Sequence, residues 1–269
     1  MNASLRPVIL RCDSLPSTNT EAARQATEGA PEGLCIVARE QTKGRGRQER
    51  VWISPAGAGL YFSIVLRPNK LPMQCWPLLT LMGAISVHDA LLESCALRTD
   101  IKWPNDIMAN ERKLCGILAE TVETKTGRAV ILGIGINLDD RAFPPELKEI
   151  ATSVSSLTGS QPDVEALLQS LVRAIGLRYK MLQSPGGGEE TLRDWSEHSS
   201  YAHDARVRVS LSTETFEGRT RGLEPDGALR VETDEGELKI VRAGDVTSLR
   251  VTSEPIAECG LKNQTALSS

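Results

Sequence analysis

Apolar and polar positions divide the chain into a long mixed segment and a short segment of strands. In the long segment, β-branched and aromatic runs predict strands, whereas apolar residues at helical spacing predict helices. The expected strands lie at 8–10, 34–38, 59–66, 101–108, 112–120 and 130–138, and the expected helices at 21–26, 72–96, 163–183 and 189–198. Residues 139–160 look irregular, and the Pro-Gly-Gly-Gly run at 185–188 is the strongest loop signal.

From Ala205 the pattern changes to short strands separated by turns such as Pro225-Asp226-Gly227. These strands are expected at 206–211, 215–222, 228–233, 237–241 and 247–251. Such a pattern predicts a small β-barrel that follows a larger α+β domain. We therefore expect a main domain at 1–200, a barrel domain at 205–252 and a polar tail at 253–269.

The segment from Gln41 to Arg50 combines four cations, one carboxylate and two glycines in ten residues. Glycine lets the backbone approach a ligand closely, and arginine offers a forked donor that suits phosphate or carboxylate oxygens. The segment is compatible with a solvated basic loop, with a cradle for a small anion and with a nucleic-acid patch. It is not a phosphate-binding P-loop, because no Gly-Lys-Ser/Thr follows the glycines.

Composition narrows these alternatives. The 269 residues carry a net charge of −4, with 40% hydrophobic and 25% charged residues, as is ordinary for a globular protein. An acidic chain is not drawn to nucleic acid by its overall charge. The local cation cluster at 43–50 therefore favours a small anionic ligand, and no nucleic-acid partner is expected.

The six cysteines lie at least twenty positions apart, and the three histidines show no ligand spacing. A built-in metal site is therefore not expected. The N-terminus lacks the pattern of a signal peptide, and no run of eighteen apolar residues follows. We expect a cytoplasmic protein with reduced cysteines and no membrane partner.

Two further stretches have a structural and a functional interpretation. Thr18 and Glu21 fit a capping box at a helix start, but the same polar groups could face a ligand. Gly133 and Gly135 interrupt a strand that is expected to be buried. Glycines there are unfavourable unless a ligand or another backbone element packs closely over them.

Five ordered stretches strongly resemble those of the biotin protein ligases, also called biotin–[acetyl-CoA-carboxylase] ligases. The resemblance extends from residue 8 to about residue 250 and implies a monofunctional member, because about sixteen residues before Ser17 are too few for a DNA-binding domain. The stretches are Ser17-Thr18-Asn19, Gly44-Arg45-Gly46-Arg47, Lys102-Trp103-Pro104-Asn105-Asp106, Lys113-Leu114-x-Gly116-Ile117-Leu118 and Gly133-Ile134-Gly135-Ile136-Asn137.

The resemblance implies a fold and a reaction. The implied fold is α+β: a catalytic domain similar to class II aminoacyl-tRNA synthetases, with a mixed sheet and flanking helices, and a small C-terminal Src-homology-type barrel. The implied enzyme joins biotin to ATP, giving biotinyl-5′-AMP and pyrophosphate, and then transfers biotin to a lysine of a biotin carboxyl carrier protein. ATP and its Mg²⁺ are the implied cofactors, and an exposed sheet edge would allow a homodimer.

The resemblance also assigns roles to residues. It implies that Lys113, Arg45 and Arg47 are catalytic, because cations must bring two anionic reactants together and stabilise the charge that develops. It implies that Asn105 and Asp106 face the nucleotide or Mg²⁺. Biotin or its adenylate is expected to contact Ser17, Thr18, Asn19, Gln41, Gly44, Arg45, Gly46, Arg47, Lys113, Gly133 and Gly135.

The sequence departs from the family at Glu49, where the family loop usually has a glycine. A carboxylate there could pair with Arg47 or Arg50 and weaken the positive field of the loop. Trp52 and Trp103 are expected to be packing residues. Two other functions remain in view: a lipoate or octanoate ligase or transferase of the same fold, whose ligands lack biotin's ureido group, and a biotin-sensing regulator without catalysis.

Overall fold

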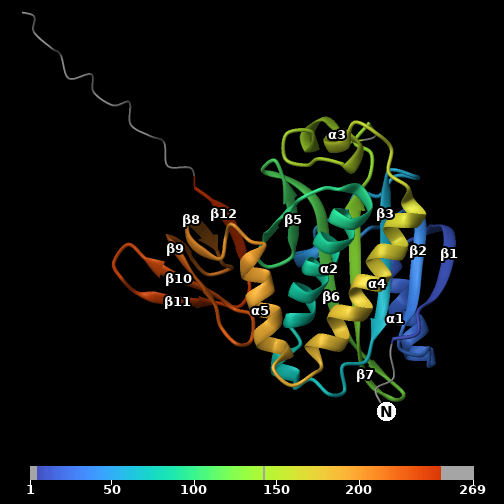
Figure 1. Cartoon of the computed structure of the whole chain (residues 1–269), viewed down its shortest axis with the longest axis horizontal. Helices are drawn as coiled ribbons and strands as arrows, with labels where there is room; N and C mark the ends of the chain where they lie inside the picture. The colour runs from blue at the N-terminus through green and yellow to red at the C-terminus, as the bar shows by residue number, and fades with distance from the viewer. Residues whose placement is uncertain (1–4, 142, 250–269) are drawn as a thin grey trace, which may run out of the picture.

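A seven-stranded mixed sheet forms the centre of residues 8–137 in a computed structural model that describes residues 5–141 and 143–249 (Figure 1). The strand order is β1-β2-β3-β7-β6-β5-β4, and β1 and β2 form its parallel pair. The strands are β1 (Val8–Leu15), β2 (Leu34–Gln41), β3 (Gly59–Leu66), β4 (Asp100–Lys102), β5 (Asp106–Ala109), β6 (Arg112–Thr124) and β7 (Gly127–Asn137). The other expected strands of the main domain are confirmed, although β1 is longer than expected, whereas the strand expected at 101–108 is divided at residues 103–105 into the antiparallel pair β4 and β5.

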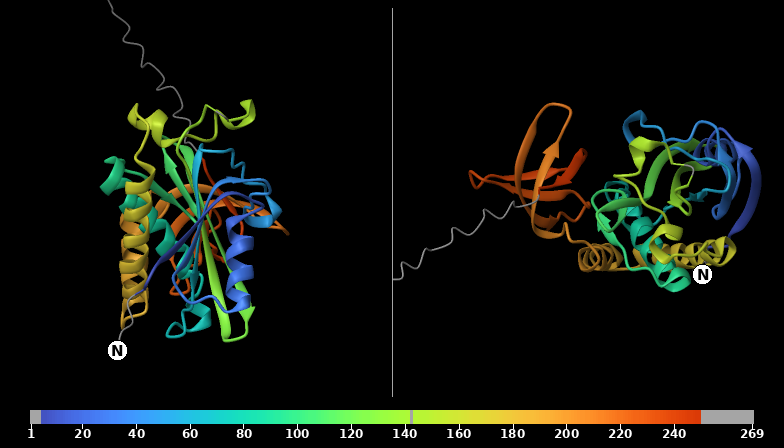
Figure 2. Two further views of the ribbon diagram at one scale, coloured as in Figure 1. Left: turned by 90° about the vertical axis from the view of Figure 1, so that its right-hand side faces the viewer. Right: turned by 90° about the horizontal axis from the view of Figure 1, so that it is seen from above.

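Helices lie on both faces of this sheet. α1 (Thr18–Glu28) lies on one face, and α2 (Leu78–Cys95) and α4 (Val164–Leu182) lie on the other (Figure 2). Ala22 and Ala26 of α1 pack in a small cluster that includes Ile36, Val65 and Ile131. The α2 face holds the larger core, which large aliphatic and aromatic side chains fill.

The apolar character of the long helix α2 is explained by this core. The segment Met73–Cys95 is long and apolar enough to cross a membrane, with a mean hydropathy of 1.4 over an 18-residue window. However, 67% of that window is buried inside the protein, where α2 packs against α4 and the sheet. The α-helix begins at Leu78 rather than at residue 72, and a short 3₁₀ turn at Met73–Cys75 precedes it.

The C-terminal strands form a separate antiparallel sheet with the order β11-β10-β9-β8-β12 (Figure 1). Its strands are β8 (His203–Ser210), β9 (Thr215–Leu223), β10 (Leu229–Thr233), β11 (Leu238–Val241) and β12 (Asp245–Ser248). Trp103, in the turn between β4 and β5, donates a hydrogen bond from Nε1 to the Gly227 carbonyl oxygen at 2.9 Å. The expected end of the last strand at 250–251 and the tail at 253–269 lie outside the described residues.

Two expectations about irregular segments were wrong in part. The glycine run at 185–188 is not simply a loop, because α5 (Gly187–Glu197) begins within it and Gly186 occupies its N-cap at φ 77°. A Cβ on Gly187 would lie 2.0 Å from the Met181 carbonyl oxygen, so the run forms a tight junction between two helices. Residues 139–160 include a 3₁₀ turn (Pro145–Leu147) and α3 (Val154–Thr158).

Alanine substitutions at two glycines with open space around them should change the free energy of unfolding in opposite directions, because the two backbone conformations differ. Gly176 lies inside α4 and Gly127 begins β7 at φ 104°, and an added Cβ would meet no atom within 4 Å at either site. Gly176→Ala should raise the free energy of unfolding by about 0.5–1 kcal/mol, because alanine favours the helix. Gly127→Ala should lower it by about 1 kcal/mol, because of left-handed strain. Urea unfolding measures both; equal effects would contradict the assigned backbone conformations.

Candidate functional site

A single cavity of about 600 Å³ brings together residues from distant parts of the chain. It lies where the N-terminus of α1, the 41–53 loop and strands β5, β6 and β7 meet, and β12 of the C-terminal sheet contributes Asp245 and Thr247. The candidate residues that line it are Ser17, Thr18, Asn19, Gln41, Arg45, Gly46, Arg47, Asn105, Asp106, Lys113, Gly133 and Gly135. Gly44 is the candidate residue that does not line the cavity.

Buried polar groups occupy the end of the cavity near α1. The Asn19 amide donates from Nδ2 to the Leu118 carbonyl oxygen at 3.2 Å and to Glu120 Oε2 at 2.8 Å. Its Oδ1 accepts from Ser63 Oγ at 2.6 Å. These contacts hold the amide in one place, and both Asn19 and Ser63 are buried.

The expected capping box at the start of α1 is wrong. Ser17, not Thr18, is the N-cap residue, and its side chain does not cap the helix. Thr18 turns instead to Gln41, whose Oε1 accepts from the Thr18 amide at 2.8 Å and from Thr18 Oγ1 at 3.1 Å. Glu21 accepts from Arg24 and Gln25 on the same helix. The start of α1 is therefore hydrogen-bonded to Gln41 at the end of β2, and its own side chains do not cap it.

The glycines of β6 and β7 leave room for the side chains of Asn19 and Trp52, which lie against the face of the sheet. A Cβ on Gly133 would lie 2.0 Å from Asn19 Oδ1, and a Cβ on Gly135 would lie 2.5 Å from Trp52 Nε1. Gly116 pairs with Gly135 across the two strands, and its Cβ would also meet the Trp52 ring, at 3.0 Å. Side chains, rather than a backbone element, thus fill the space above the glycines in this structure.

The loop that follows β2 is fixed by its own backbone. The amides of Thr42 and Lys43 donate to the carbonyl oxygens of Leu15 and Pro16, and the Trp52 amide donates to the Gly44 carbonyl oxygen at 3.0 Å. A Cβ on Gly44 would lie 2.2 Å from the Trp52 carbonyl oxygen. Gly44 therefore closes the base of the loop, which explains why it does not line the cavity.

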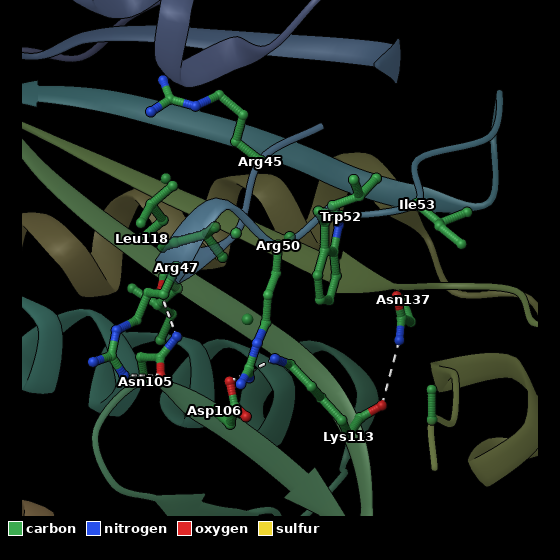
Figure 3. A pocket seen from close by; sticks show the side chains of 18 of the residues that line it. Arg45, Arg47, Arg50, Trp52, Ile53, Asn105, Asp106, Lys113, Leu118 and Asn137 are labelled. Atoms are coloured by element: carbon green, nitrogen blue, oxygen red, sulfur yellow. Dashed lines mark hydrogen bonds and ion pairs between the residues drawn. The ribbon is translucent and has the colours of Figure 1, made fainter. Parts of the chain in front are cut away.

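The three arginines of the loop contact three different parts of the protein. Arg45 Nη2 lies 2.5 Å from Glu120 Oε1 on β6, and Arg47 Nη1 donates to Asn105 Oδ1 at 3.0 Å. Arg50 forms an ion pair with Asp245 of the C-terminal sheet. Figure 3 shows that Arg47 and Arg50 extend toward Asn105 and Asp106, whereas the Arg45 guanidinium points away from them.

Glu49 does not form the ion pair with Arg47 or Arg50 that a carboxylate at this position could make. Within the described residues Glu49 is exposed and forms no ion pair, because Arg50 is engaged by Asp245 and Arg47 by Asn105. The backbone of Glu49 has a φ of 60°, in the left-handed region that favours glycine. Glu49 thus bears on the loop through its backbone conformation, because its carboxylate forms no ion pair among the described residues.

Lys113, at the start of β6, also lines the cavity. Its Nζ is 2.7 Å from Asp106 Oδ1 and 5.4 Å from the centroid of the Trp52 ring, so a carboxylate and an aromatic face hold the ammonium group (Figure 3). The backbone of Lys113 is also fixed, because its amide donates to the Ile150 carbonyl oxygen and its carbonyl oxygen accepts from the Thr152 amide, both at 2.9 Å.

Burial destabilises the positive charges around Lys113. It lowers the pKa of the Arg47 guanidinium, and the carboxylates of Asp245 and Asp106 oppose that shift. Burial likewise lowers the pKa of Lys102, with Asp106 opposing and Lys113 adding to the shift. Cations that are partly removed from water favour an anionic ligand, which would restore the stability of their charged forms.

Sequence reasoning missed several of the residues that shape this site. Trp52, expected to be a packing residue, is half-buried over the glycines, and its Nε1 is buried without a hydrogen-bond partner in the described part of the chain. The sequence offered one signal for a role of Trp52 in the site, because Trp52 lies in the apolar run at 51–53 that directly follows the basic loop. Glu120 and Asp245 gave no such signal, because they reach the loop only through the tertiary fold.

The arrangement joins a pocket of fixed polar groups to a cluster of cations within one cavity. It can hold a ligand that has hydrogen-bonding groups at one end and a negative charge at the other. Among residues 5–141 and 143–249, no group of three or more His, Cys, Asp or Glu side chains could hold a metal ion.

Comparisons with known proteins agree in pointing to one family. The biotin/lipoate A/B protein ligase family matches residues 11–137, and the biotin protein ligase C-terminal domain matches residues 203–247. The chain is 40% identical to the bifunctional ligase/repressor BirA of Bacillus subtilis, over 86% of this chain and 71% of that protein. It is 33% identical to a biotin–[acetyl-CoA-carboxylase] ligase of Mycobacterium tuberculosis, over 87% of this chain and 86% of that one.

A solved structure is similar over nearly its whole length. The biotin protein ligase from Aquifex aeolicus in complex with biotin and ATP superposes with a TM-score of 0.77 and 30% sequence identity. The match covers 90% of this chain and 98% of the Aquifex chain. It therefore includes both the mixed sheet and the C-terminal antiparallel sheet.

The contact between Trp52 and the glycines can be tested directly. Gly135→Ala should displace the indole, because the new Cβ would lie 2.5 Å from Nε1, whereas Gly116→Ala places its Cβ 3.0 Å from the ring edge and should disturb it less. Acrylamide quenching of Trp52 fluorescence, isolated by subtracting the matched Trp52→Phe variants, should increase more in Gly135→Ala. Equal quenching in the two variants and the parent would contradict this packing.

Proposed function

This chain belongs to the biotin/lipoate A/B protein ligase family, and we propose that it is an ATP-dependent biotin ligase. In the first step, a biotin carboxylate oxygen attacks the α-phosphorus of ATP, and pyrophosphate leaves. In the second step, a lysine amine of a biotin carboxyl carrier protein attacks the carbonyl carbon of biotinyl-5′-AMP. An amide bond forms, AMP leaves and the amine loses a proton.

One observation carries the proposal: fixed hydrogen-bonding groups and desolvated cations line the same cavity. Biotin has a ureido ring at one end and a carboxylate at the other, and it must meet a triphosphate at the carboxylate. The cavity contains both kinds of group: Asn19 lies over Gly133, and the cations Lys113 and Arg47 line the same cavity.

The polar end would bind the ureido ring. The ring offers two N–H donors and one carbonyl acceptor, so hydroxyl and amide groups are suited to bind it. We assign this contact to Ser17, Thr18, Asn19 and Gln41. Gly133 and Gly135 would line the ligand site by leaving room for the side chains of Asn19 and Trp52, against which the ligand would lie. An octanoyl or lipoyl chain offers no such donors, so these buried polar groups would lose water without a replacement partner.

The cationic end would hold the reacting groups. Lys113 supplies a compact charge between the carboxylate and the α-phosphate, and it would stabilise the charge that develops during displacement. Arg45, Gly46 and Arg47 would retain the adenylate until the carrier lysine arrives, with Gly44 shaping the loop that holds them. An incoming anion would compete with Asp106 for Lys113, so ligand binding would replace one ion pair with another.

Asn105 and Asp106 are the oxygen donors that we assign to the nucleotide side. One carboxylate and one amide fit a Mg²⁺ ion that arrives with ATP, because Mg²⁺ is usually held by few protein groups together with phosphates. Such an ion would neutralise charge on the phosphate oxygens.

Finer features of organisation belong to the same proposal. We assign residues 1–200 to the catalytic domain, similar to class II aminoacyl-tRNA synthetases, 205–252 to an Src-homology-type barrel and 253–269 to a tail. The five antiparallel C-terminal strands support the barrel assignment. We place the enzyme in the cytoplasm, with the carrier protein as partner and with neither nucleic acid nor membrane. The exposed Val8 and Leu10 on the edge strand β1 are compatible with a homodimer.

The direct test is to incubate the purified protein with ATP, Mg²⁺, biotin and a biotin carboxyl carrier domain. We expect a mass increase on one carrier lysine and release of pyrophosphate and AMP. Modification by lipoate or octanoate, with none by biotin, would favour the second family activity. Tight biotin binding without any transfer would favour a regulator.

Lys113→Ala should reduce adenylate formation by about 10²–10³-fold while changing the dissociation constant of biotin much less. The reason is that Lys113 acts mainly on charge that develops in the transition state. Pyrophosphate release and calorimetry measure the two quantities, and Lys125→Ala, on an exposed turn, is the matched control.

The variant leaves Asp106 without its ion-pair partner, so its loss of activity needs a second variant for interpretation. Lys113→Ala with Asp106→Asn removes the unpaired charge and should remain as inactive as the single variant. Recovery of activity in the double variant, or equal losses of binding and rate in the single one, would contradict the role of Lys113.

A further inference from the structure

Glu120 is a carboxylate beside a cavity that is suited to anions, and none of the roles described above needs it to touch a ligand. Its side chain bridges two elements: Oε2 accepts from Asn19 Nδ2 of α1 at 2.8 Å, and Oε1 lies 2.5 Å from Arg45 Nη2 of the loop. These partners lie 101 and 75 residues away along the chain. A negative charge at this place would weaken anion binding, so it must be compensated elsewhere.

The Asn19 amide can face the cavity in two ways, because its oxygen and its nitrogen have nearly the same shape. An ionised carboxylate accepts hydrogen bonds and donates none. Glu120 therefore requires the N–H side of the amide, and the Leu118 carbonyl oxygen accepts the second N–H at 3.2 Å. Oδ1 is consequently turned toward Ser63 and Gly133. Its second lone pair is the remaining acceptor of this amide.

The absence of a Cβ at Gly133 makes this orientation possible. The position of that Cβ would be 2.0 Å from Asn19 Oδ1, so any side chain there would displace the oxygen. Gly133 pairs with Leu118 on β6 and with Ser63 on β3, the two residues whose oxygens complete the amide's contacts. The sheet register and the glycine thus fix the acceptor of a residue that lines the cavity.

Arg45 supplies the charge that makes this carboxylate tolerable. Its guanidinium is turned toward Glu120 and away from Arg47 and Arg50 (Figure 3). The pair lies beside the polar end of the cavity, so the charge of Glu120 is neutralised locally. The positive potential around Lys113 therefore comes from the other cations that line the cavity, Arg47, Arg50 and Lys102.

From these contacts we propose that Glu120 is a positioning residue that sets the hydrogen-bond polarity of Asn19, and thereby selects ligands with an N–H donor. The inference rests on the proposed function and adds the source of its ligand selectivity. Loss of Glu120 would let the amide turn over and present N–H to the N–H of the ureido ring. The affinity for an acyl chain without N–H groups would not depend on the orientation of the Asn19 amide.

The experiment compares Glu120→Ala and Glu120→Gln with Glu123→Ala, which removes another ion-paired carboxylate from the same strand but outside the cavity. Glu120→Ala should raise the dissociation constant and the KM of biotin about tenfold, while the KM of ATP stays within about threefold. Glu120→Gln retains an acceptor for Asn19 and should recover most of the affinity. Glu123→Ala should behave as the parent protein does.

A reciprocal exchange distinguishes orientation from general damage to the fold. Asn19→Asp places two carboxylates together and should bind biotin poorly. Adding Glu120→Gln restores a hydrogen bond in the reverse direction, because the glutamine amide donates to the aspartate carboxylate. This double variant should recover at least part of the lost affinity for biotin. Failure of this rescue, an unchanged biotin affinity in Glu120→Ala, or equal increases in both KM values would overturn the proposal. A parent protein that never uses biotin would instead overturn the proposed function.

Discussion

The site depends on the absence of side chains at Gly116, Gly133 and Gly135, on two neighbouring strands. Glycine within a strand is unfavourable in itself, by roughly 0.5–1 kcal/mol relative to alanine. Here it allows Asn19 and Trp52 to lie directly on the backbone, at distances that no Cβ could accommodate. The cost to the sheet is offset by the large apolar core on the opposite face, where α2 and α4 cover it.

The packing over these glycines also separates two kinds of chemistry within one cavity. Asn19 and its hydrogen-bond partners are fixed by neutral contacts and one compensated carboxylate. Elsewhere in the cavity, Lys113 is held by Asp106 and the Trp52 ring, and Arg47 is held by Asn105. A phosphate could replace the contacts with Asp106 and Asn105. A rigid recognition end and an exchangeable charged end suit an enzyme that must bind one substrate and activate it with another.

The order of helices and strands could be predicted from apolar periodicity, because it is a local property of the sequence. The candidate residues could also be brought together, because five motifs in one order resemble a known family. The partners of those residues could not be predicted. Arg45 meets Glu120 75 residues away and Arg50 meets Asp245 195 residues away, so neither contact leaves a local pattern. The glycines in β7 indicated close packing, but not that Asn19 and Trp52 provide it.

We propose, as the central point, that one cavity binds a ureido ring at Asn19 and a reacting phosphate at Lys113. A crystal structure with a non-hydrolysable analogue of biotinyl-5′-AMP tests it most directly. We expect the ring beside Asn19, with an N–H within hydrogen-bond distance of Oδ1, and the phosphate surrogate between Lys113 and Arg47. An analogue bound with its ring away from Asn19, or with its phosphate surrogate contacting neither cation, would contradict the account.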